Sequence, residues 1–342
     1  MPKKNSEALL SLVPVTYSGI QVNCCRNPHC ENFQKDPIQN NVFLSDYYRL
    51  TGTDHYKLLQ CLLCKKISPL KSNKAVHEEL VRISNNLEQA GAHPCTNESC
   101  ENHTKPFQLN PGRYHRNGFT NAGRQRVICK LCGDSFTLSD NRRESRRTKE
   151  YRDLLVFRML VNQGHIKGIA RVTELSPAGV YDAIERIWQQ CIAFTAHRER
   201  KLQNTLTGVF VNVGTDSQEL TVNWISRHDR RITLLSAISS VDNVTGYALA
   251  INVNFDDKTD KDSVEEQAKD SGDLEKSPHL RKFSRFWLDQ DYQRAIDKSR
   301  GGEGYDDSEI DAGARLPVKG MLVHKEYTLM AHMRYLVSSN MK

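Results

Sequence analysis

The chain has 342 residues, of which 38% are hydrophobic and 26% charged, and its formal net charge at pH 7 is +7. This length is enough for two or three domains with cores of ordinary size. No stretch approaches the about 18 consecutive apolar residues of a membrane-spanning helix, so the sequence excludes a membrane protein. Residues 1–20 hold a short apolar run that Ser11 and Pro14 interrupt, with no cleavage pattern after it. This excludes a secretion signal and predicts a leader segment in a cytoplasmic protein.

The charge is unevenly distributed along the chain. Residues 256–276 hold nine acidic residues and four lysines, so the remainder carries a formal net charge of about +12. A basic body with a separate acidic segment favours a nucleic-acid partner over an acidic small molecule, although such a charge also serves solubility alone.

Nine of the ten cysteines lie before residue 133, in two copies of one pattern. The run CRNPHCEN begins at Cys25 and CTNESCEN begins at Cys95, and a Cys-x-x-Cys pair follows each after an insert of 30 or 28 residues. This is a tandem duplication, and two close thiolate pairs supply the four ligands of a tetrahedral zinc site. We therefore expect zinc ribbons over residues 21–70 and 90–140. The two structural Zn²⁺ sites predicted are Cys25, Cys30, Cys61 and Cys64, and Cys95, Cys100, Cys129 and Cys132.

Three alternatives concern the same segment. The cysteines would form disulfides in an exported protein, but no export signal is present and the cytosol is reducing. Cys24 competes with Cys25 as a ligand, and the alignment of the two copies favours Cys25. His29 and His103 lie near the cysteines, and we interpret both as surface residues because each cysteine set is already complete.

The second copy carries the most specific signature. Its run GRQRVICKLCG at residues 123–133, followed by Phe136, closely resembles the zinc-binding module at the amino terminus of bacterial insertion-sequence transposases. The resemblance is specific over residues 95–136 and weaker over 25–66, where the Gly-x-x-Arg lead-in and the trailing Cys-Gly are missing. It implies a protein that binds double-stranded DNA and is associated with the bacterial nucleoid.

A basic stretch, NRRESRRTKEYR, follows the second copy at residues 141–152. Such a density of cations neutralises phosphates and gives DNA affinity that does not depend on sequence. A solvated linker or a first helical turn is the alternative. The cations expected to contact DNA are Arg142, Arg143, Arg146, Arg147 and Lys149.

The helical signals that follow belong to the expected domain 141–200. One apolar helical stripe is predicted, formed by Leu154, Leu155, Phe157, Leu160 and Val161. Gly164 ends this run, and a short helix is expected over residues 166–174.

The next helix has a strong start signal. Ser176 is a suitable N-cap and Pro177 occupies the first helical position, and the buried stripe expected after them is Val180, Ile184 and Ile187. Two short helices joined by a tight turn predict a helix-turn-helix whose second helix enters a major groove. The residues expected at the base edges are Ala178, Gly179, Tyr181 and Asp182. The alternative is a plain three-helix packing unit, and Trp188 and Cys191 are interpreted as core.

Beyond residue 205 the pattern becomes that of β-strands. Three strand-like runs are separated by turn candidates at 226–229 and 242–245. Three successive antiparallel strands, the first bearing an acid, resemble the opening meander of the RNase H-like fold of DDE-type transposases and integrases. This resemblance implies Asp216 as the first of three carboxylates that hold two Mg²⁺ or Mn²⁺ ions. Asp242 is interpreted as a structural acid at the second turn.

The remainder of the domain 205–342 departs from that fold. Residues 256–278 predict a disordered or extended acidic insertion, residues 281–296 an amphipathic helix, and residues 326–342 the start of another helix. No second or third carboxylate is recognisable on a later strand or helix. The acids available lie in helical or loop context: Asp289, Asp291, Asp306, Asp307 and Asp311.

Together these features predict a multidomain α+β protein with tandem zinc ribbons, a helix-turn-helix and a partial RNase H-like α/β domain. The leading interpretation is a transposase-derived, zinc-dependent DNA-binding protein that recognises insertion-element ends and lacks a complete catalytic carboxylate set. One alternative is an active DDE-type transposase or nuclease, which would require Mg²⁺ or Mn²⁺. Another is a zinc and helix-turn-helix transcription regulator. A homo-oligomer is compatible with each.

Overall fold

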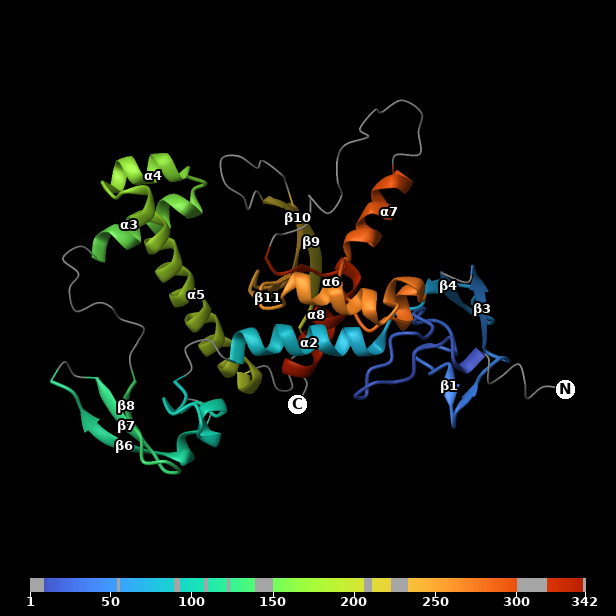
Figure 1. Cartoon of the computed structure of the whole chain (residues 1–342), viewed down its shortest axis with the longest axis horizontal. Helices are drawn as coiled ribbons and strands as arrows, with labels where there is room; N and C mark the ends of the chain where they lie inside the picture. The colour runs from blue at the N-terminus through green and yellow to red at the C-terminus, as the bar shows by residue number, and fades with distance from the viewer. Residues whose placement is uncertain are drawn as a thin grey trace. The chain divides into compact units, whose positions relative to one another are not determined.

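The computed structural model describes residues 9–53, 56–88, 93–107, 110–121, 124–138, 150–205, 211–222, 233–299 and 319–340. It is a mixed α+β structure, as the sequence predicts (Figure 1). The chain forms two compact units, one made of Met1–Ile83 with Gly208–Lys342 and the other of Ser84–Thr207. We call them the discontinuous unit and the inserted unit. The duplicated cysteine segments therefore belong to different units.

The first cysteine module, residues 9–70 of the discontinuous unit, is built from short antiparallel strands. β1 (Ile38–Gln39) and β2 (Val42–Phe43) form a small hairpin. β3 (Tyr48–Gly52), β4 (Lys57–Cys61) and β5 (Ile67–Pro69) form a three-stranded sheet in that order. The apolar core beneath them is small: Val13, Phe43, Tyr48, Leu59 and Leu70. A core of this size needs a crosslink or further packing to be stable.

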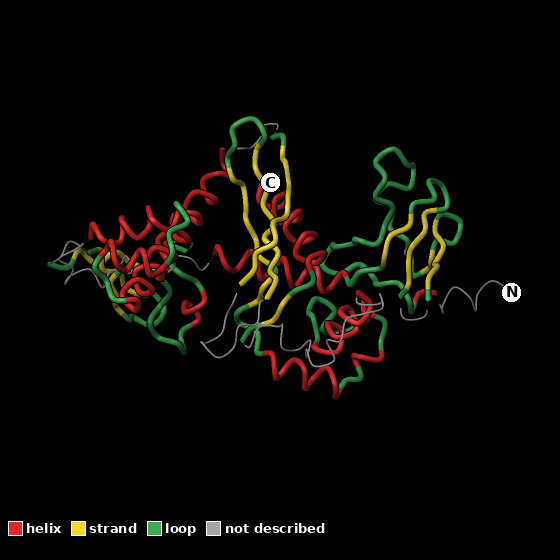
Figure 2. The backbone as a smooth tube through the Cα atoms, turned by 90° about the horizontal axis from the view of Figure 1, so that it is seen from above, coloured by secondary structure: helices red, strands yellow, loops and turns green. Residues whose placement is uncertain are grey.

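The second part of the discontinuous unit contains the predicted meander. β9 (Val213–Val222), β10 (Thr233–Asp242) and β11 (Ala248–Val253) form an antiparallel sheet in the order β11-β10-β9 (Figure 2). At the turn after β10 the carboxylate of Asp242 accepts a hydrogen bond from the backbone N–H of Thr245 at 3.0 Å, the structural role expected of it. The predicted turn at 226–229 lies outside the described residues.

Both faces of the meander are covered in part. On one face, Leu235 of β10 packs with Leu322 and Trp287. On the opposite face, the hydroxyl of Ser240 lies 2.8 Å from Nε2 of His332 on α8 (Lys325–Asn340). β12 (Phe255–Asp256) and β13 (Met321–Leu322) form a separate two-stranded ladder, which ties the end of the meander to the start of α8.

The two parts of the discontinuous unit share one core. α2 (Asn73–Glu88) follows directly after the first cysteine module and buries Ala75 and Val76 against residues of α6 (Lys261–Asp270) and α8. The members of this core come from both ends of the chain: Ile20, Ala75, Val76, Val264, Ala268, Phe286, Leu288, Met321, Val323 and Tyr327. The first cysteine module is therefore built into the same body as the meander.

A buried ion network joins the same segments. Glu79 of α2 is fully buried and accepts hydrogen bonds from Arg82, from Arg285 at 3.1 Å and from the hydroxyl of Thr328 at 2.9 Å. Arg82 also donates to the backbone carbonyls of residues 253 and 255, both at 2.8 Å. Each charge in the network has an opposite partner, as burial requires.

The acidic segment 256–278 is folded, which corrects the expectation of a disordered or extended insertion. Asp260 caps α6 by accepting from the backbone N–H of Ser263. Asp273 is fully buried and accepts from the backbone N–H groups of Lys282 and Phe283, both at 3.0 Å. The acidic composition of the segment predicted disorder because it does not reveal the groups that bind these carboxylates. Those groups include residues outside the segment, such as Lys282 and Phe283.

The helix expected over residues 281–296 begins later than predicted. α7 spans Asp289–Ser299, whereas Phe286 and Leu288 precede it and belong to the shared core. Arg281 holds Asp291 in an ion pair, and the backbone N–H of Trp287 donates to the carbonyl of Leu322 at 2.9 Å. These tertiary bonds hold residues 281–288 in a non-helical path.

The inserted unit begins with the second cysteine module, residues 93–138. Short 3₁₀ turns at Glu101–Thr104 and Pro111–Arg113 lead into β6 (Tyr114–Phe119), β7 (Gln125–Cys129) and β8 (Ser135–Thr137), an antiparallel sheet in that order. Its core contains Tyr114, Val127, Phe136 and the cysteines, all from the same module. The cysteine core of the first module is equally local, but Ile20 of that module also joins the core shared with the carboxy-terminal part of the chain.

Three helices complete the inserted unit: α3 (Glu150–Val161), α4 (Ile166–Thr173) and α5 (Pro177–Thr205). Their core is Val156, Ile169, Val180 and Ala183, with Ile184 and Ile187 packed against it. The predicted boundaries of α4 and the start of α5 are close to those observed.

The predicted apolar stripe of α3 is wrong at three of its five residues. Leu154, Phe157 and Val161 are exposed, and the helix is buried through Val156, with Met159 and Leu160 packed against the core. Apolar residues lie all around this helix, so the sequence does not identify the side that meets α4 and α5. Trp188 and Cys191 are also exposed instead of being core, because α5 is 29 residues long and they lie beyond the residues of α5 that join this core.

Candidate metal centres and nucleic-acid interface

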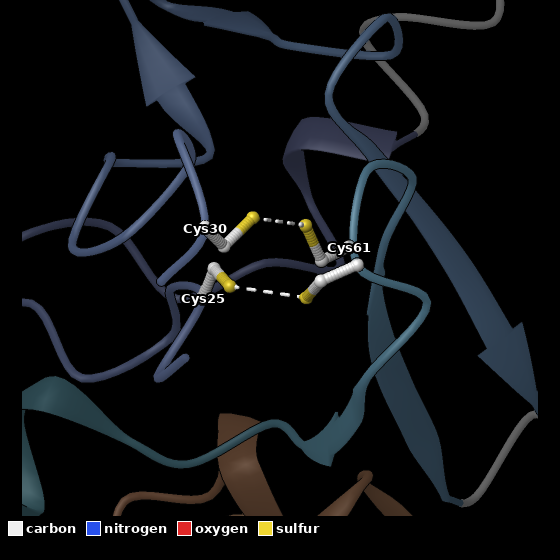
Figure 3. Close-up of side chains that lie close together, drawn as sticks. Cys25, Cys30 and Cys61 are labelled. Atoms are coloured by element: carbon white, nitrogen blue, oxygen red, sulfur yellow. Dashed lines mark hydrogen bonds between the residues drawn. The ribbon is translucent and has the colours of Figure 1, made fainter. Parts of the chain in front are cut away.

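The first cysteine module brings four sulfurs together. Cys25 and Cys30 come from a loop before β1, Cys61 ends β4, and Cys64 lies in the turn that follows. Sγ of Cys25 lies 3.5 Å from Sγ of Cys64, and Sγ of Cys30 lies 3.8 Å from Sγ of Cys61. Figure 3 shows Cys25, Cys30 and Cys61 directed into the same space between the two loops.

The second cysteine module repeats this arrangement. Sγ of Cys95 lies 3.4 Å from Sγ of Cys132, and Sγ of Cys100 lies 3.8 Å from Sγ of Cys129. In both modules all four sulfurs lie within 4.8 Å of one another. The eight cysteines singled out from the repeat are thus the eight that the structure assembles into two metal-binding sets.

The sulfur geometry fits a tetrahedral metal ion. A Zn–S bond of about 2.3 Å places tetrahedral sulfurs about 3.8 Å apart. The observed paired distances, 3.4 to 3.8 Å, are close to that value. They are far longer than the about 2.05 Å of a disulfide, and all eight thiols are unbridged. Each set can therefore hold one structural metal ion.

The competing ligands lie outside both sets. Cys24 is buried beside the first set but is not a member of it, and burial raises the pKa of its thiol. His29 is exposed, as expected. His103 is half-buried, and its Nδ1 lies 2.8 Å from the carbonyl oxygen of Cys95, so it supports a ligand loop without being a ligand.

Two asparagines that the sequence reading passed over contact the sulfurs. Nδ2 of Asn32 donates to Sγ of Cys61 at 3.4 Å, and Nδ2 of Asn102 donates to Sγ of Cys129 at 3.2 Å. Each is the Asn of the repeated Cys-Glu-Asn, and each is buried. Hydrogen bonds of this kind orient ligands and tune a metal site. The repetition of Cys-Glu-Asn in the sequence was the feature from which Asn32 and Asn102 could have been predicted.

A tyrosine in each module fixes the loop that carries the first cysteine pair. The hydroxyl of Tyr48 donates to the carbonyl of Lys35 at 2.7 Å, and that of Tyr114 donates to the carbonyl of Lys105 at 2.7 Å. Both tyrosines stand opposite the third cysteine of their set in the ladder, Tyr48 opposite Cys61 and Tyr114 opposite Cys129. No short sequence pattern identifies these tyrosines, because the number of residues between Tyr48 and Cys61 differs from the number between Tyr114 and Cys129.

Hydrogen bonds to sulfur lower the pKa of the third cysteine of each set, Cys61 and Cys129. Burial acts to raise the pKa of Cys61, but the backbone N–H of Cys64 and the side chain of Asn32 outweigh it and lower this pKa to about 6. The same balance, with the backbone of Cys132 and the side chain of Asn102, lowers the pKa of Cys129 to about 6. Burial raises the pKa of Cys25 and of Cys95 to about 12. A divalent ion bound between them would favour the thiolate form of all four.

The start of α5 presents the residues expected to meet base edges. Ala178, Asp182 and Tyr181 are exposed, the last at 60%, and Gly179 is half-buried. The hydroxyl of Ser176 accepts from the backbone N–H of Gly179 at 3.1 Å, so Ser176 is the predicted N-cap. The basic residues Arg142, Arg143, Arg146, Arg147 and Lys149 lie outside the described residues.

The net charge of the chain belongs to the inserted unit alone. Residues 84–207 contain 19 Lys and Arg against 12 Asp and Glu, a formal net charge of +7. The discontinuous unit contains 29 of each and is formally neutral. The positive potential that attracts a polyanion is thus concentrated on the unit that carries α4, α5 and the second cysteine module.

Asp216 stands alone as a candidate catalytic carboxylate. It lies on β9 opposite Ser239 and is exposed. Asp289 pairs with Lys261 at 2.9 Å and Asp291 pairs with Arg281. Among the described residues, the two cysteine sets are the only groups of three or more His, Cys, Asp or Glu close enough to share a metal ion. Asp306, Asp307 and Asp311 lie outside the described residues.

None of the described helices is both long and apolar enough to cross a membrane. Comparison of the chain with protein-family models, with curated proteins and with solved structures gave no match.

Proposed function

We propose that the protein is a zinc-dependent DNA-binding protein derived from an insertion-sequence transposase. The observation that carries this proposal is the concentration of the whole formal net charge of +7 on the inserted unit. That unit also holds a four-cysteine set and a helix, α5, whose amino-terminal residues are exposed. A positive unit of this composition is suited to the phosphate backbone of double-stranded DNA.

The metal of both sites is zinc in this proposal. Four thiolates in two close pairs form the ligand set that structural zinc prefers, and the sulfur spacings agree with a tetrahedral ion. The short sheets around each set are the support expected of zinc ribbons. Zinc there has a structural role, because four protein ligands leave no open position for a substrate.

The proposed base-reading element is a helix-turn-helix formed by α4 and α5. α4 ends at Thr173, the next residue, Glu174, has a φ of 53° and reverses the chain, and α5 begins at Pro177. Ile169 of α4 and Val180 of α5 lie in the same core of the inserted unit, which supports both helices. Tyr181 and Asp182 remain exposed near the start of α5, where a recognition helix meets base edges.

The proposed role is binding to insertion-element ends without strand transfer by this chain. The meander and Asp216 are consistent with a partial RNase H-like domain. A two-metal reaction needs several carboxylates around ions about 4 Å apart. The lone position of Asp216 among the described residues supports a binding role over an enzymatic one.

The test is binding of the zinc-loaded full chain to duplexes that contain or lack the element ends, followed by fluorescence anisotropy at several salt concentrations. Replacement of Arg142, Arg143, Arg146 and Arg147 by alanine should weaken binding to all duplexes and flatten the salt dependence by about 0.9 for each lost phosphate contact. Tyr181→Ala should instead reduce the preference for the specific duplex. Trp188→Ala is the matched control, since Trp188 is also exposed on α5 but far from its start. Salt-independent binding, or no binding, would refute the proposal.

A further inference from the structure

The two cysteine modules have the same metal geometry but opposite surroundings. In the first, Ile20 packs into the shared core with residues of α2, α6 and α8, and Nδ2 of Asn23 donates to the carbonyl of Lys71 just before α2. In the second, the core is closed within the module, and five consecutive residues of β6 after Tyr114 are exposed. The hairpin of β6 and β7 therefore offers a surface that metal binding alone does not explain.

The modules also differ in charge. Residues 102–133 run from Asn102 to Gly133, the residue after the last cysteine of the set. They contain six Lys and Arg and no acidic residue. The corresponding residues 32–65 of the first module contain four Lys and Arg and three Asp. The ladders align the two modules through Tyr114 opposite Cys129 and Tyr48 opposite Cys61. At matching places the second module has Arg116 and Arg126 where the first has Leu50 and Leu58.

The register of the hairpin places these cations on opposite faces. Arg116 stands opposite Val127 in the ladder, and Arg126 is the next residue along β7, so their side chains leave the three-stranded sheet on different faces. Both are exposed. Phe119 ends β6 opposite Gln125 and is 69% exposed. Its ring is therefore in solvent at the end of the hairpin, beyond the two arginines in the ladder.

We propose that the β6–β7 hairpin of the second cysteine module enters the major groove of duplex DNA with β6, the edge strand of the β6-β7-β8 sheet, leading. The major groove is about 12 Å wide and admits β-strands, and its walls are two rows of phosphates. Arg116 then meets one row and Arg126 the other, while Phe119 reaches the groove floor and makes apolar contact with a thymine methyl group. This inference rests on the proposed DNA-binding function and adds a second contact beside the start of α5.

The first measurement is the salt dependence of affinity of the zinc-loaded full chain for a mixed-sequence 30-base-pair duplex, by fluorescence anisotropy. Arg116→Ala with Arg126→Ala should lower the magnitude of the slope of log affinity against log salt by about 1.8, since two phosphate contacts are lost. The matched control is Arg49→Ala with Lys57→Ala on the hairpin of the first module, which should leave the slope unchanged. Zinc content and circular dichroism verify that each variant is folded.

The second measurement tests the groove contact of Phe119. Replacing thymine by uracil in the duplex removes only the major-groove methyl groups. Wild type should lose more affinity on this exchange than Phe119→Ala does, whereas Tyr56→Ala, an aromatic residue 55% exposed on the loop of the first module, should behave as wild type.

The outcomes separate this inference from the proposed function. If wild type binds duplex DNA and the hairpin variants bind with unchanged slope and unchanged response to uracil, the hairpin is not a contact and only the inference is refuted. If the Phe119 effect is larger on a single-stranded 30-mer than on the duplex, the assignment to the major groove is refuted. If wild type does not bind DNA, both fail.

Discussion

Asn32 and Asn102 are the residues that most directly link the repeated sequence to the chemistry of the metal sites. Each occupies the last position of a Cys-Glu-Asn triplet and donates to the sulfur of the third cysteine of its set. A carboxamide is suited to this task because it offers an N–H without adding charge near the thiolates.

Removing one of these donors should weaken metal binding at its own site. We expect Asn102→Ala to lower zinc affinity of the second module by about 10-fold to 100-fold, the effect typical of a lost ligand-supporting hydrogen bond. Competition with a chromophoric chelator measures this directly. Asn117→Ala, an exposed position on β6, is the control and should leave affinity unchanged. Equal affinity of Asn102→Ala and wild type would show that the hydrogen bond is dispensable.

His332 should make the stability of the discontinuous unit depend on pH. It is fully buried, and its ring nitrogens lie 2.8 Å from the hydroxyl of Ser240 and 2.8 Å from Nδ2 of Asn252. Burial lowers the pKa of His332 below its usual value near 6.5. The unfolded chain therefore takes up a proton at a higher pH than the folded chain. The stability is complete above about pH 6.5 and is lost as the pH falls toward the folded pKa.

The measurement is urea unfolding between pH 7.5 and 5.5, followed by circular dichroism. His332→Gln removes one titrating group, so its free energy of unfolding should fall less steeply with acid than that of wild type, by at most about 1.4 kcal/mol per pH unit. Loss of zinc in acid affects both proteins, and the difference between them isolates the histidine. Parallel pH profiles would contradict the assignment.

At the scale of single elements, the sequence predicted local features well and tertiary ones poorly. Cysteine spacing, the Ser176 cap and the three strands of the meander depend on neighbouring residues, and all are present. The buried side of α3 depends on which helices pack against it, and its apolar residues permitted several choices. The acidic segment 256–278 looked disordered because its stabilising contacts, such as that of Asp256 with Arg285 at 2.9 Å, join residues far apart.

The two cysteine modules should respond differently to loss of their metal. Because α2 and the first module share a core with α6 and α8, Cys61→Ser should lower the protection of β10 and α8 amides in hydrogen exchange. Cys129→Ser disrupts a core that is closed within its own module and should leave those amides unchanged. Equal effects of the two substitutions on β10 would argue against the first module as part of the discontinuous unit.

At the scale of the whole molecule, metal-dependent DNA cleavage is not expected of this chain. Among the residues that the structure describes, Asp216 belongs to no group of three acids, and one exposed carboxylate does not hold two ions about 4 Å apart. Strand cleavage and joining should therefore be absent on duplex ends with Mg²⁺ or Mn²⁺, for wild type and Asp216→Ala alike. Activity in wild type that Asp216→Ala abolishes would instead favour the transposase or nuclease alternative.

The discontinuous unit also sets an order of events during synthesis on the ribosome. Val76 of α2 emerges roughly 190 residues before its core partner Val264, an interval of about 10 to 40 s at ordinary translation rates. Once Ile187 has emerged, the inserted unit has all the residues of its two cores, whereas the apolar side of α2 is still without Val264 and the later residues that cover it. Nascent chains stalled before residue 264 should thus resist a protease within the inserted unit and be cut within α2. The apolar side of α2 is therefore exposed for more than half of the synthesis of this chain. We expect chaperones to bind it during that time.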